Sequence, residues 1–551
     1  MKKIAAVLLL LLTCQAYAQP TVRQFTFKHR WVDSVYNALT LEERIGQLFM
    51  VAAYSGGENK NDRQIQSLID RHGIGGVIFM QGTPEAQAQQ TNRFQKAAKV
   101  PLLVAMDAEW GLGMRLTGVK DLPRQMTIGA SRSDTLMYEI GVAVAEQCKR
   151  LGVHINFAPA VDINSNPKNP VIGFRSFGSD KELVSRLGIA YMQALQSNGV
   201  MACAKHFPGH GDVTVDSHHD LPQIDKDAAA LKVLELYPFQ QLFDRGIQSV
   251  MIAHLNLPQL DTARVPSTLS YNIVTNLLKK EMKFDGLIFT DALNMKGVAN
   301  YYPAGEVEVL AFLAGNDVLL FSQDVGLAIQ KIVAAYHNGT LTEERLAHSV
   351  KKILGAKYDK GLQYYTPVEE QRVTEDLNKA YDDIMLHTAV QTATLVSDHY
   401  KMIPAFSKIK NKAFITFNAS EQQIKMYKAH YPNAVFINMD SRQNAAYILK
   451  TLRTLPKGTM LVGSLHKLSR YPGDKEQYGY SDSQIQVLQY LSQQKQSLLL
   501  LYGVPYMSRH FCKAPALLVA YEDQPAFQNN IIRVLEGALP PNGTLPVEIC
   551  R

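Results

Sequence analysis

Cysteine and tryptophan are scarce in this 551-residue chain, which has five cysteines and two tryptophans. The cysteines lie far apart and form no CxxC pair, so neither a zinc ribbon nor a disulfide framework is indicated. Cys203 lies within an apolar run, and we interpret it as a small core residue. A glycine-rich phosphate loop is also missing, which argues against a nucleotide site.

Strong charge of either sign is absent as well. The net charge is +7, and no basic run is interleaved with aromatic residues, so we expect no nucleic-acid partner. So mild an excess would tolerate an anionic polymer as partner. Hydrophobic residues make up 46% and charged residues 19%, which is typical of a soluble globular enzyme. The length predicts two domains.

The sequence also lacks apolar runs long enough to cross a membrane. The run from Ile4 to Leu12 is too short, and it lies between two lysines and an Ala16-Tyr17-Ala18 cleavage site, as in a signal peptide. We predict cleavage after Ala18 (signal peptide 1–18) and export to the periplasm or the exterior. A lipoprotein signal at Cys14 is the alternative, which we disfavour because Thr13 precedes it where Gly or Ala is usual.

Eight short apolar runs between residues 46 and 322 have the composition of strands buried on both faces. They are 46–52, 73–80, 101–109, 154–163, 199–209, 249–258, 286–293 and 317–322. Helical patterns lie between most of them, at 83–99, 134–151, 181–197, 226–245 and 267–280. We predict an α/β fold with a (β/α)8 TIM-type barrel, and the doubly wound open sheet is the alternative.

Polar residues end five of these runs. The C-terminal ends of barrel strands meet on one face, where active sites lie. One Asp after a strand often caps the next helix, but five polar ends on one face are typical of a catalytic site. The polar ends are Asp107 and Glu109, Asp162, Lys205 and His206, His254 and Asn256, and Asp291.

The pattern changes after about residue 365. Five further apolar runs follow, at 411–418, 433–439, 458–464, 496–503 and 516–522. They predict a second, smaller open-sheet α/β sandwich domain. The predicted boundaries are 27–365 for the barrel, 366–390 for a charged connector and 391–551 for the second domain.

The densest group of ionisable residues is KHFPGHGDVTVDSHHDLP, from Lys205 to Pro222. Such a density is costly in a folded protein unless a function uses it. KHFPGHG followed by DSH resembles the signature of the bacterial β-N-acetylglucosaminidases of glycoside hydrolase family 3, the NagZ type. Segments that resemble the same family in order are MDAEWG (106–111) with Arg115, NFAPAVDIN (156–164), GFRSFGSD (173–180), FTDALNM (289–295), YGVPY (502–506), YEDQ (521–524) and GTLPVEI (543–549).

The resemblance implies a retaining exo-β-N-acetylglucosaminidase without a cofactor, acting on cell-wall muropeptides or related glycans. It implies Asp291 as nucleophile and His218, paired with Asp216, as acid/base. The implied sugar-binding residues are Asp107, Arg115, Arg175, Lys205 and His206. The glycines at 209 and 211 then suggest a mobile lid over residues 207–222.

Several of these residues have alternative roles. Asp291 could cap a helix, Arg175 could form a structural salt bridge, and Trp110, where the family usually has Gly, could stack on a sugar or simply pack. The histidines and aspartates of the 205–222 segment could bind a metal, but their spacing matches no zincin pattern. The alternative functions are another family 3 exo-glycosidase such as a β-glucosidase, a phosphorylase, and a catalytically dead glycan-binding protein. Oligomeric state is not indicated.

Overall fold

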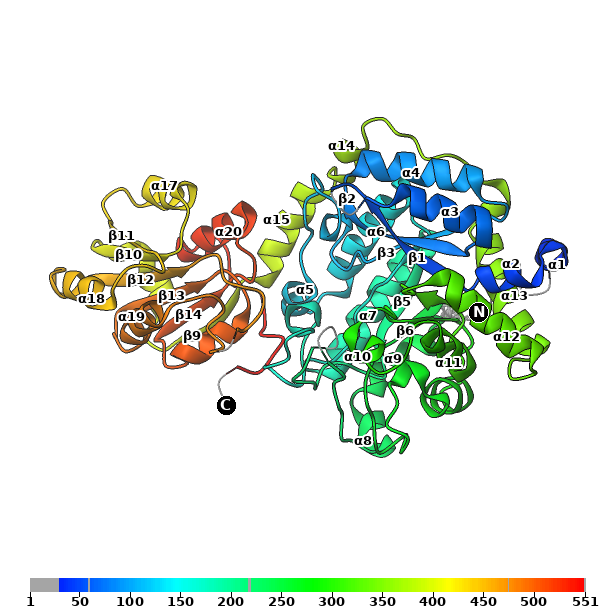
Figure 1. Cartoon of the computed structure of the whole chain (residues 1–551). Helices are drawn as coiled ribbons and strands as arrows, with labels where there is room; N and C mark the ends of the chain where they lie inside the picture. Colours follow the sequence, from blue (N-terminus) through cyan, green and yellow to red (C-terminus); the bar gives the residue numbers. More distant parts are fainter. Residues whose placement is uncertain (1–28, 58–59, 217–219, 474, 550–551) are drawn as a thin grey trace, which may run out of the picture.

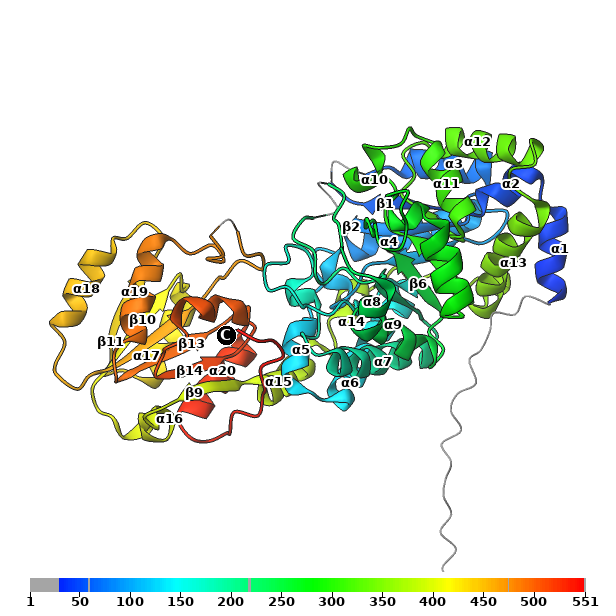
Figure 2. The same ribbon diagram turned by 90° about the horizontal axis from the view of Figure 1, so that it is seen from below.

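The computed structural model describes residues 29–57, 60–216, 220–473 and 475–549, which form two domains joined side by side (Figure 1, Figure 2). The predicted signal peptide 1–18, with Cys14, lies outside these ranges, and so do His218 and His219.

The N-terminal domain is a barrel of eight parallel strands. They are β1 (Phe49–Ser55), β2 (Gly76–Gly82), β3 (Leu103–Met106), β4 (Ile155–Asn156), β5 (Met201–Phe207), β6 (Ser249–Ile252), β7 (Leu287–Thr290) and β8 (Leu319–Leu320). Hydrogen-bonded neighbours follow chain order, and β8 pairs with β1. A bridge between Phe289 and Val318 joins β7 to the start of β8 and closes the ring. The barrel prediction is therefore confirmed, and the open doubly wound sheet is excluded.

Helices surround this barrel on the outside (Figure 1). They are α1 (Arg30–Ala38), α2 (Leu41–Gly46), α3 (Asp62–His72), α4 (Pro84–Ala97), α5 (Gln125–Ser131), α6 (Asp134–Arg150), α7 (Lys181–Ser197), α8 (Ala228–Val233), α9 (Leu236–Phe243), α10 (Lys296–Ala299), α11 (Glu306–Ala314), α12 (Val325–His337) and α13 (Glu343–Asp359). Thr40 caps α2, and Glu43 completes the capping box. The predicted helix at 226–245 is two helices, and 267–280 is a 3-10 turn followed by a π-helix, η4 (Asn272–Glu281).

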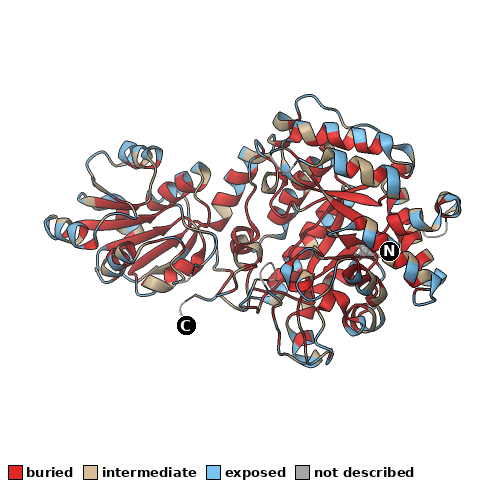
Figure 3. Cartoon of the chain, viewed as in Figure 1, coloured by how far each residue is buried: buried red, intermediate tan, exposed pale blue. Residues whose placement is uncertain are grey.

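The barrel strands are buried on both faces, as their continuous apolar composition requires (Figure 3). Every residue of β5 is buried, from Met201 to Phe207, including Lys205 and His206 at its end. Lys205 and His206 thus lie at the C-terminal end of a buried strand, where other polar groups can satisfy them.

The second domain contains a six-stranded sheet in the order β11-β10-β12-β13-β14-β9. Its parallel strands are β10 (Lys412–Phe417), β11 (Val435–Met439), β12 (Met460–Leu465), β13 (Ser497–Leu501) and β14 (Ala516–Val519). The edge strand β9 (Thr394–Asp398) runs antiparallel to β14 and was not predicted, because its polar sequence lacks the apolar signature of the other five. The covering helices are α16 (Met402–Ala405), α17 (Glu421–His430), α18 (Ala445–Arg453), α19 (Asp482–Ser492) and α20 (Pro525–Leu535).

Two helices follow the barrel and lead into this second domain. α14 (Val373–Leu377) lies on the barrel surface, and α15 (Tyr381–Thr392) packs against both α5 and α20. The domains are also joined by a buried ion pair, Arg124 Nη1 to Glu522 Oε2, at 2.8 Å. The second domain is therefore fixed against the barrel on the side of α5.

Two general features of the described chain bear on its environment. No described helix has both the length and the apolar character that crossing a bilayer demands. Cys148 and Cys203 are free and buried, whereas Cys512 is disulfide-bonded. The sequence indicated no disulfide framework, and spacing along the chain does not show which cysteines meet in the fold.

Candidate active site

A cavity of about 410 Å³ opens at the C-terminal ends of the barrel strands. The family resemblance assigns catalytic or sugar-binding roles to eight residues. The cavity wall contains six of them: Asp107, Arg115, Arg175, Lys205, His206 and Asp291. The strands β3, β5 and β7 deliver most of these groups: Asp107 and Asp291 directly follow β3 and β7, and Lys205 and His206 lie in the last residues of β5. The structure therefore brings together residues that lie up to 184 positions apart in the sequence.

A buried lysine binds two carboxylates at the base of this cavity. Lys205 Nζ lies 2.8 Å from Asp107 Oδ1 and 2.8 Å from Glu109 Oε1. Arg115 Nη2 donates to the other oxygen of Asp107 at 2.5 Å. Arg175 binds Glu109 through Nη2 at 2.6 Å and Nε at 3.0 Å. Two acids and three bases thus form one network of charge-assisted hydrogen bonds.

The charges in this network hold both acids ionised. Burial alone would raise the pKa of Asp107, but Lys205 and Arg115 hold it well below its usual range. Burial likewise opposes ionisation of Glu109, and the charges of Arg175 and Lys205 outweigh it and lower its pKa to about 2. Burial would lower the pKa of Lys205, and the two carboxylates raise it. The network therefore offers both acceptors and donors, which is what sugar hydroxyls need.

Asp162 binds the ring of His206 near the end of β5 and the backbone that follows β5. Its Oδ2 lies 2.7 Å from His206 Nδ1, and its Oδ1 accepts the backbone N–H of His210 at 2.7 Å. Burial would raise the pKa of Asp162, but His206 and the backbone donor lower it to about 2. His206 Nε2 lies 3.3 Å from Arg175 Nη2, so Asp162 fixes the ring that faces the cavity.

Asp291 follows β7 directly and lines the cavity. Its Oδ1 accepts the N–H of Ala292 at 2.8 Å, and its own N–H donates to Ile252 O on β6 at 2.9 Å. His254, another predicted strand-end residue, lies with Nε2 3.0 Å from Ala292 O. His254 is not among the described residues of the cavity wall, and it supports the turn that carries Asp291.

The segment after β5 is held more tightly than the predicted lid requires. A Cβ on Gly211 would overlap the carbonyl oxygen of Ile163, and Gly209, at φ 125°, would place a Cβ 2.8 Å from Cβ of Glu235. His210 and Val213 are buried. These glycines allow close packing of the backbone, and the lid over residues 207–222 stays a prediction. Asp216, half-buried, follows in the loop, and its proposed partner His218 lies outside the described residues.

Two aromatic residues of the wall are Trp110, for which the sequence left stacking and packing open, and Tyr471, which the sequence analysis missed. Trp110 is only 6% exposed, with its ring 5.7 Å from that of Phe174 and 5.3 Å from the Arg124 guanidinium, so packing is its main role. Tyr471 reaches the cavity from the second domain. Sequence alone offers no signal for Tyr471, because it lies 180 positions after Asp291 in a loop without a motif.

Within the described ranges, no three or more His, Cys, Asp or Glu side chains are grouped so that they could hold a metal ion. Asp107 and Glu109 in the cavity wall are instead paired with Arg115, Lys205 and Arg175.

Comparisons with known proteins agree with this geometry. The family profile "Glycosyl hydrolase family 3 N terminal domain" matches residues 40–356. Beta-hexosaminidase A of Pseudoalteromonas piscicida is 32% identical over 365 residues, 58% of this chain and 61% of that protein. The "Beta-N-acetylglucosaminidase/beta-glucosidase" of Cellulomonas fimi is 26% identical over 394 residues, 68% of this chain and 67% of that protein.

A solved structure extends the similarity to both domains. The glycoside hydrolase family 3 beta-N-acetylglucosaminidase from Paenibacillus sp. str. FPU-7 superposes with a TM-score of 0.76 at 28% identity, covering 93% of this chain and 99% of that one. The matched alignment with the Pseudoalteromonas protein spans about three fifths of that relative's length. Profile, sequence and fold agree, and this chain belongs to glycosyl hydrolase family 3.

Proposed function

We propose that this chain is a retaining exo-β-N-acetylglucosaminidase that removes terminal β-linked GlcNAc from cell-wall muropeptides or related glycans. One observation carries the proposal: Asp291 shares a single cavity with the Asp107–Lys205–Glu109 network. A carboxylate for the anomeric carbon thus lies beside a fixed set of donors and acceptors for sugar hydroxyls. The names of the similar proteins, which include β-hexosaminidases and a β-N-acetylglucosaminidase, support the same substrate class.

In the first step, Asp291 attacks the anomeric carbon while the leaving oxygen takes a proton from His218. The bond from the sugar to the leaving group breaks, and a glycosyl ester on Asp291 forms. Asp107, held ionised, accepts hydrogen bonds from the sugar hydroxyls, and Arg115, Lys205 and Arg175 donate to them.

In the second step, His218 takes a proton from water, and the resulting hydroxide displaces Asp291 from the sugar. Histidine suits both transfers because its ordinary pKa lies near neutrality. Asp216 would hold the tautomer of His218 and stabilise the imidazolium. The spacing of the DSH motif in a loop after β5 supports this assignment.

The compartment is part of the proposal. Cleavage after Ala18 would accompany export to the periplasm or the exterior, where cell-wall glycans are accessible. The disulfide at Cys512 supports export, because such bonds persist mainly in oxidising compartments.

Two further activities stay as alternatives. A β-glucosidase activity is favoured by the name of the Cellulomonas fimi relative, which includes both sugars. A phosphorylase is favoured by the histidine acid/base, because a neutral imidazole does not repel an incoming phosphate as a carboxylate would.

A panel of nitrophenyl β-glycosides, assayed with and without inorganic phosphate, separates these activities. Turnover of the GlcNAc glycoside that is unchanged by phosphate supports the proposal. Preference for the glucoside contradicts the sugar assignment, and release of a sugar 1-phosphate contradicts hydrolysis.

A further inference from the structure

The chain between β5 and α8 (208–227), which we call the DSH loop, is fixed at both of its ends. After β5, the backbone N–H of His210 donates to Asp162 Oδ1 at 2.7 Å. Near α8, the Nζ of Lys226 lies 2.6 Å from Asp212 Oδ2 and 2.5 Å from Glu235 Oε1. One half-buried lysine therefore joins the two ends of the loop to each other and to the start of α9.

The limb that returns from the motif is paired with the chain after β6. The N–H of Asn256 donates to Pro222 O at 2.8 Å, and Asn256 O accepts the N–H of Ile224 at 2.9 Å. The side-chain amide of Asn256 donates to Gln223 Oε1 at 3.0 Å. Asn256, one of the predicted strand-end residues, is not among the described residues of the catalytic cavity wall, and it holds the DSH loop instead.

Asp220 is a third point of attachment, between these two limbs. Its backbone N–H donates to Asp216 O at 3.1 Å, so the two ends of the stretch that contains His218 in the sequence are bonded to each other. Tyr301 donates its hydroxyl to Asp220 Oδ1 at 2.7 Å. This hydroxyl lowers the pKa of Asp220, so the acceptor is a carboxylate at neutral pH and the hydrogen bond is charge-assisted.

Tyr301 belongs to the segment that begins with Asp291, the proposed nucleophile. Successive backbone hydrogen bonds run along this segment. The N–H of Met295 donates to Ala292 O at 3.1 Å, and the N–H of Val298 donates to Met295 O at 3.0 Å. The N–H of Tyr301 then donates to Val298 O at 3.0 Å. Because each turn is bonded to the one before it, the position of Tyr301 follows that of the nucleophile.

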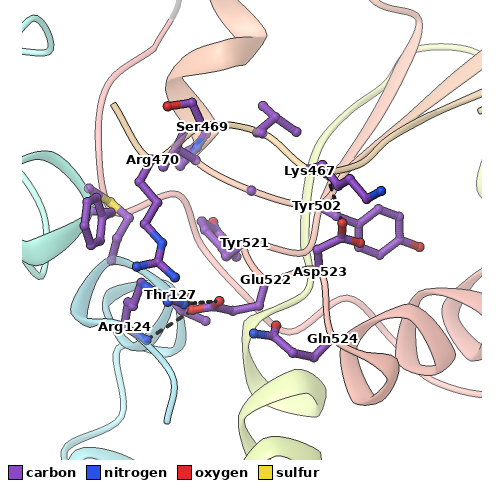
Figure 4. Close-up of a pocket in the computed structure, with 16 residues that line it drawn as sticks. Arg124, Thr127, Lys467, Ser469, Arg470, Tyr502, Tyr521, Glu522, Asp523 and Gln524 are labelled. Carbon is purple, nitrogen blue, oxygen red and sulfur yellow. Dashed lines mark hydrogen bonds and ion pairs between the residues drawn. The ribbon is translucent and has the colours of Figure 1, made fainter. Parts of the chain in front are cut away.

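The junction between the two domains is separate from this contact. A cavity of about 170 Å³ lies between the domains, and neither Asp220 nor Tyr301 is among the described residues of its wall. Figure 4 shows the pairing of Glu522 with Arg124 and Thr127 at this junction. A change at Tyr301 therefore acts on the DSH loop without removing a contact of the junction.

We propose that Tyr301 is a positioning residue for the acid/base pair, because its hydrogen bond to Asp220 holds the DSH loop in place relative to the turn that carries Asp291. A retaining glycosidase needs its nucleophile and its proton donor at a fixed separation across the bond that breaks. Here the two groups belong to loops after different strands, β7 and β5, and the Tyr301–Asp220 hydrogen bond links those loops directly. This inference rests on the proposed function.

Tyr301→Phe removes the hydroxyl and keeps the ring. General acid catalysis contributes about 10²–10⁴-fold, and a displaced donor loses part of it, so kcat/KM on the β-1,4-linked GlcNAc disaccharide should fall about tenfold. On nitrophenyl β-GlcNAc, kcat/KM should stay within about twofold, because nitrophenolate leaves without a proton. The ratio kcat/KM is the measure, since it reports the step in which the leaving group departs. Equal losses on the two substrates, or no loss on the disaccharide, would overturn the positioning role.

Tyr237→Phe is the matched control. The Tyr237 hydroxyl donates to Glu182 Oε2 at 2.8 Å, also at the exposed surface of the barrel domain, and neither residue is among the described residues of the cavity wall. This variant should keep both kcat/KM values within about twofold. A selective loss on the disaccharide in this control would mean that the effect is not particular to Tyr301, and the assignment would fall.

Asp220 is tested as the acceptor. Asp220→Asn keeps an acceptor oxygen and should retain kcat/KM on the disaccharide within about threefold. Asp220→Ala should lose at least as much as Tyr301→Phe, since it also removes the acceptor for the N–H of Leu221. In the Asp220→Ala background, Tyr301→Phe should have no further effect. Additive losses would show that the hydroxyl acts elsewhere and would contradict the proposal.

Failure of this inference differs from failure of the proposed function. If His218→Ala shows a loss that depends on the leaving group and Tyr301→Phe does not, only the positioning role is overturned. A wild-type enzyme that cleaves no GlcNAc glycoside overturns the proposed function. In that case the Tyr301 and Asp220 variants are compared on the β-glycoside that the nitrophenyl panel identifies, and equal losses on good and poor leaving groups there overturn the positioning role as well.

Discussion

Arg175 and Glu109 form a two-pronged ion pair, with Nη2 2.6 Å from Oε1 and Nε 3.0 Å from Oε2. The Glu109 side chain has no exposed surface. Glu109 therefore holds the guanidinium of Arg175 in the cavity wall. Arg175 can form this structural salt bridge and also bind a sugar. Removing the carboxylate would leave Arg175 without this ion pair and Lys205 with Asp107 as its one remaining carboxylate in the network.

We expect Glu109→Gln to lower the unfolding free energy of the barrel domain by about 3 kcal/mol. The only two tryptophans, Trp31 and Trp110, both belong to the barrel, so their fluorescence in urea follows this domain selectively. The control is Glu375→Gln, which breaks an exposed ion pair with Arg372 and should cost less than about 1 kcal/mol. Equal costs for the two variants would show that the buried network is not structural.

Asp291→Asn should reduce turnover by several orders of magnitude without loss of fold, because an amide cannot form the glycosyl ester. Steady-state rates on nitrophenyl β-GlcNAc and circular dichroism provide the two measurements. Asp285→Asn, an exposed aspartate just before β7, is the matched control and should remain active. A folded Asp291→Asn variant with near wild-type rates would remove Asp291 from the mechanism.

His218→Ala should lose far less activity on a nitrophenyl glycoside than on a natural disaccharide. Nitrophenolate leaves as a stable anion and needs no proton, whereas a sugar hydroxyl does. His387→Ala, a change at an exposed histidine on α15, should affect neither substrate. If His218→Ala lost equal activity on both substrates, His218 would not be the proton donor.

Low pH should lower the unfolding free energy of the barrel domain, in part because Asp162 becomes protonated. Its folded pKa is about 2 and its ordinary value is 3.8, so its stabilising contribution is complete above about pH 4 and is lost as pH falls through 2. We expect Asp162→Asn to cost about 2 kcal/mol at neutral pH. Urea titrations at several pH values should show the gap between wild type and variant closing from pH 4 to 2. A gap independent of pH would mean that the carboxylate charge does not matter.

Gly211→Ala should destabilise the barrel strongly, because the new Cβ would overlap the backbone of Ile163. The melting temperature followed by tryptophan fluorescence checks this. Gly326→Ala is the control: Gly326 lies in α12, and its Cβ would meet no atom closer than 3.5 Å. If the Gly211 variant kept its melting temperature but lost activity, the residue would serve motion after all, as the lid hypothesis held.

Much of the fold was determined by sequence pattern. Each of the eight apolar runs overlaps one barrel strand, because a strand buried on both faces must be largely apolar. The position of the site was also predicted, since Asp107, Lys205 and Asp291 lie at the C-terminal ends of strands, and parallel strands present those ends together. The edge strand β9 escaped this reasoning, because an edge position does not require an apolar run.

Only the tertiary structure decided how the charges pair and what closes the cavity. That Glu109 binds Arg175, or that Asp162 holds His206, depends on distances between loops that are far apart in the sequence. The glycines at 209 and 211 look like hinge residues in a sequence, yet close backbone packing is the reason for them. Tyr471 reaches the cavity because two domains dock through Arg470, Phe174 and the Arg124–Glu522 pair. Local sequence specifies strands and their polar ends through burial, whereas docking depends on the shape and charge of surfaces that exist only after both domains have folded.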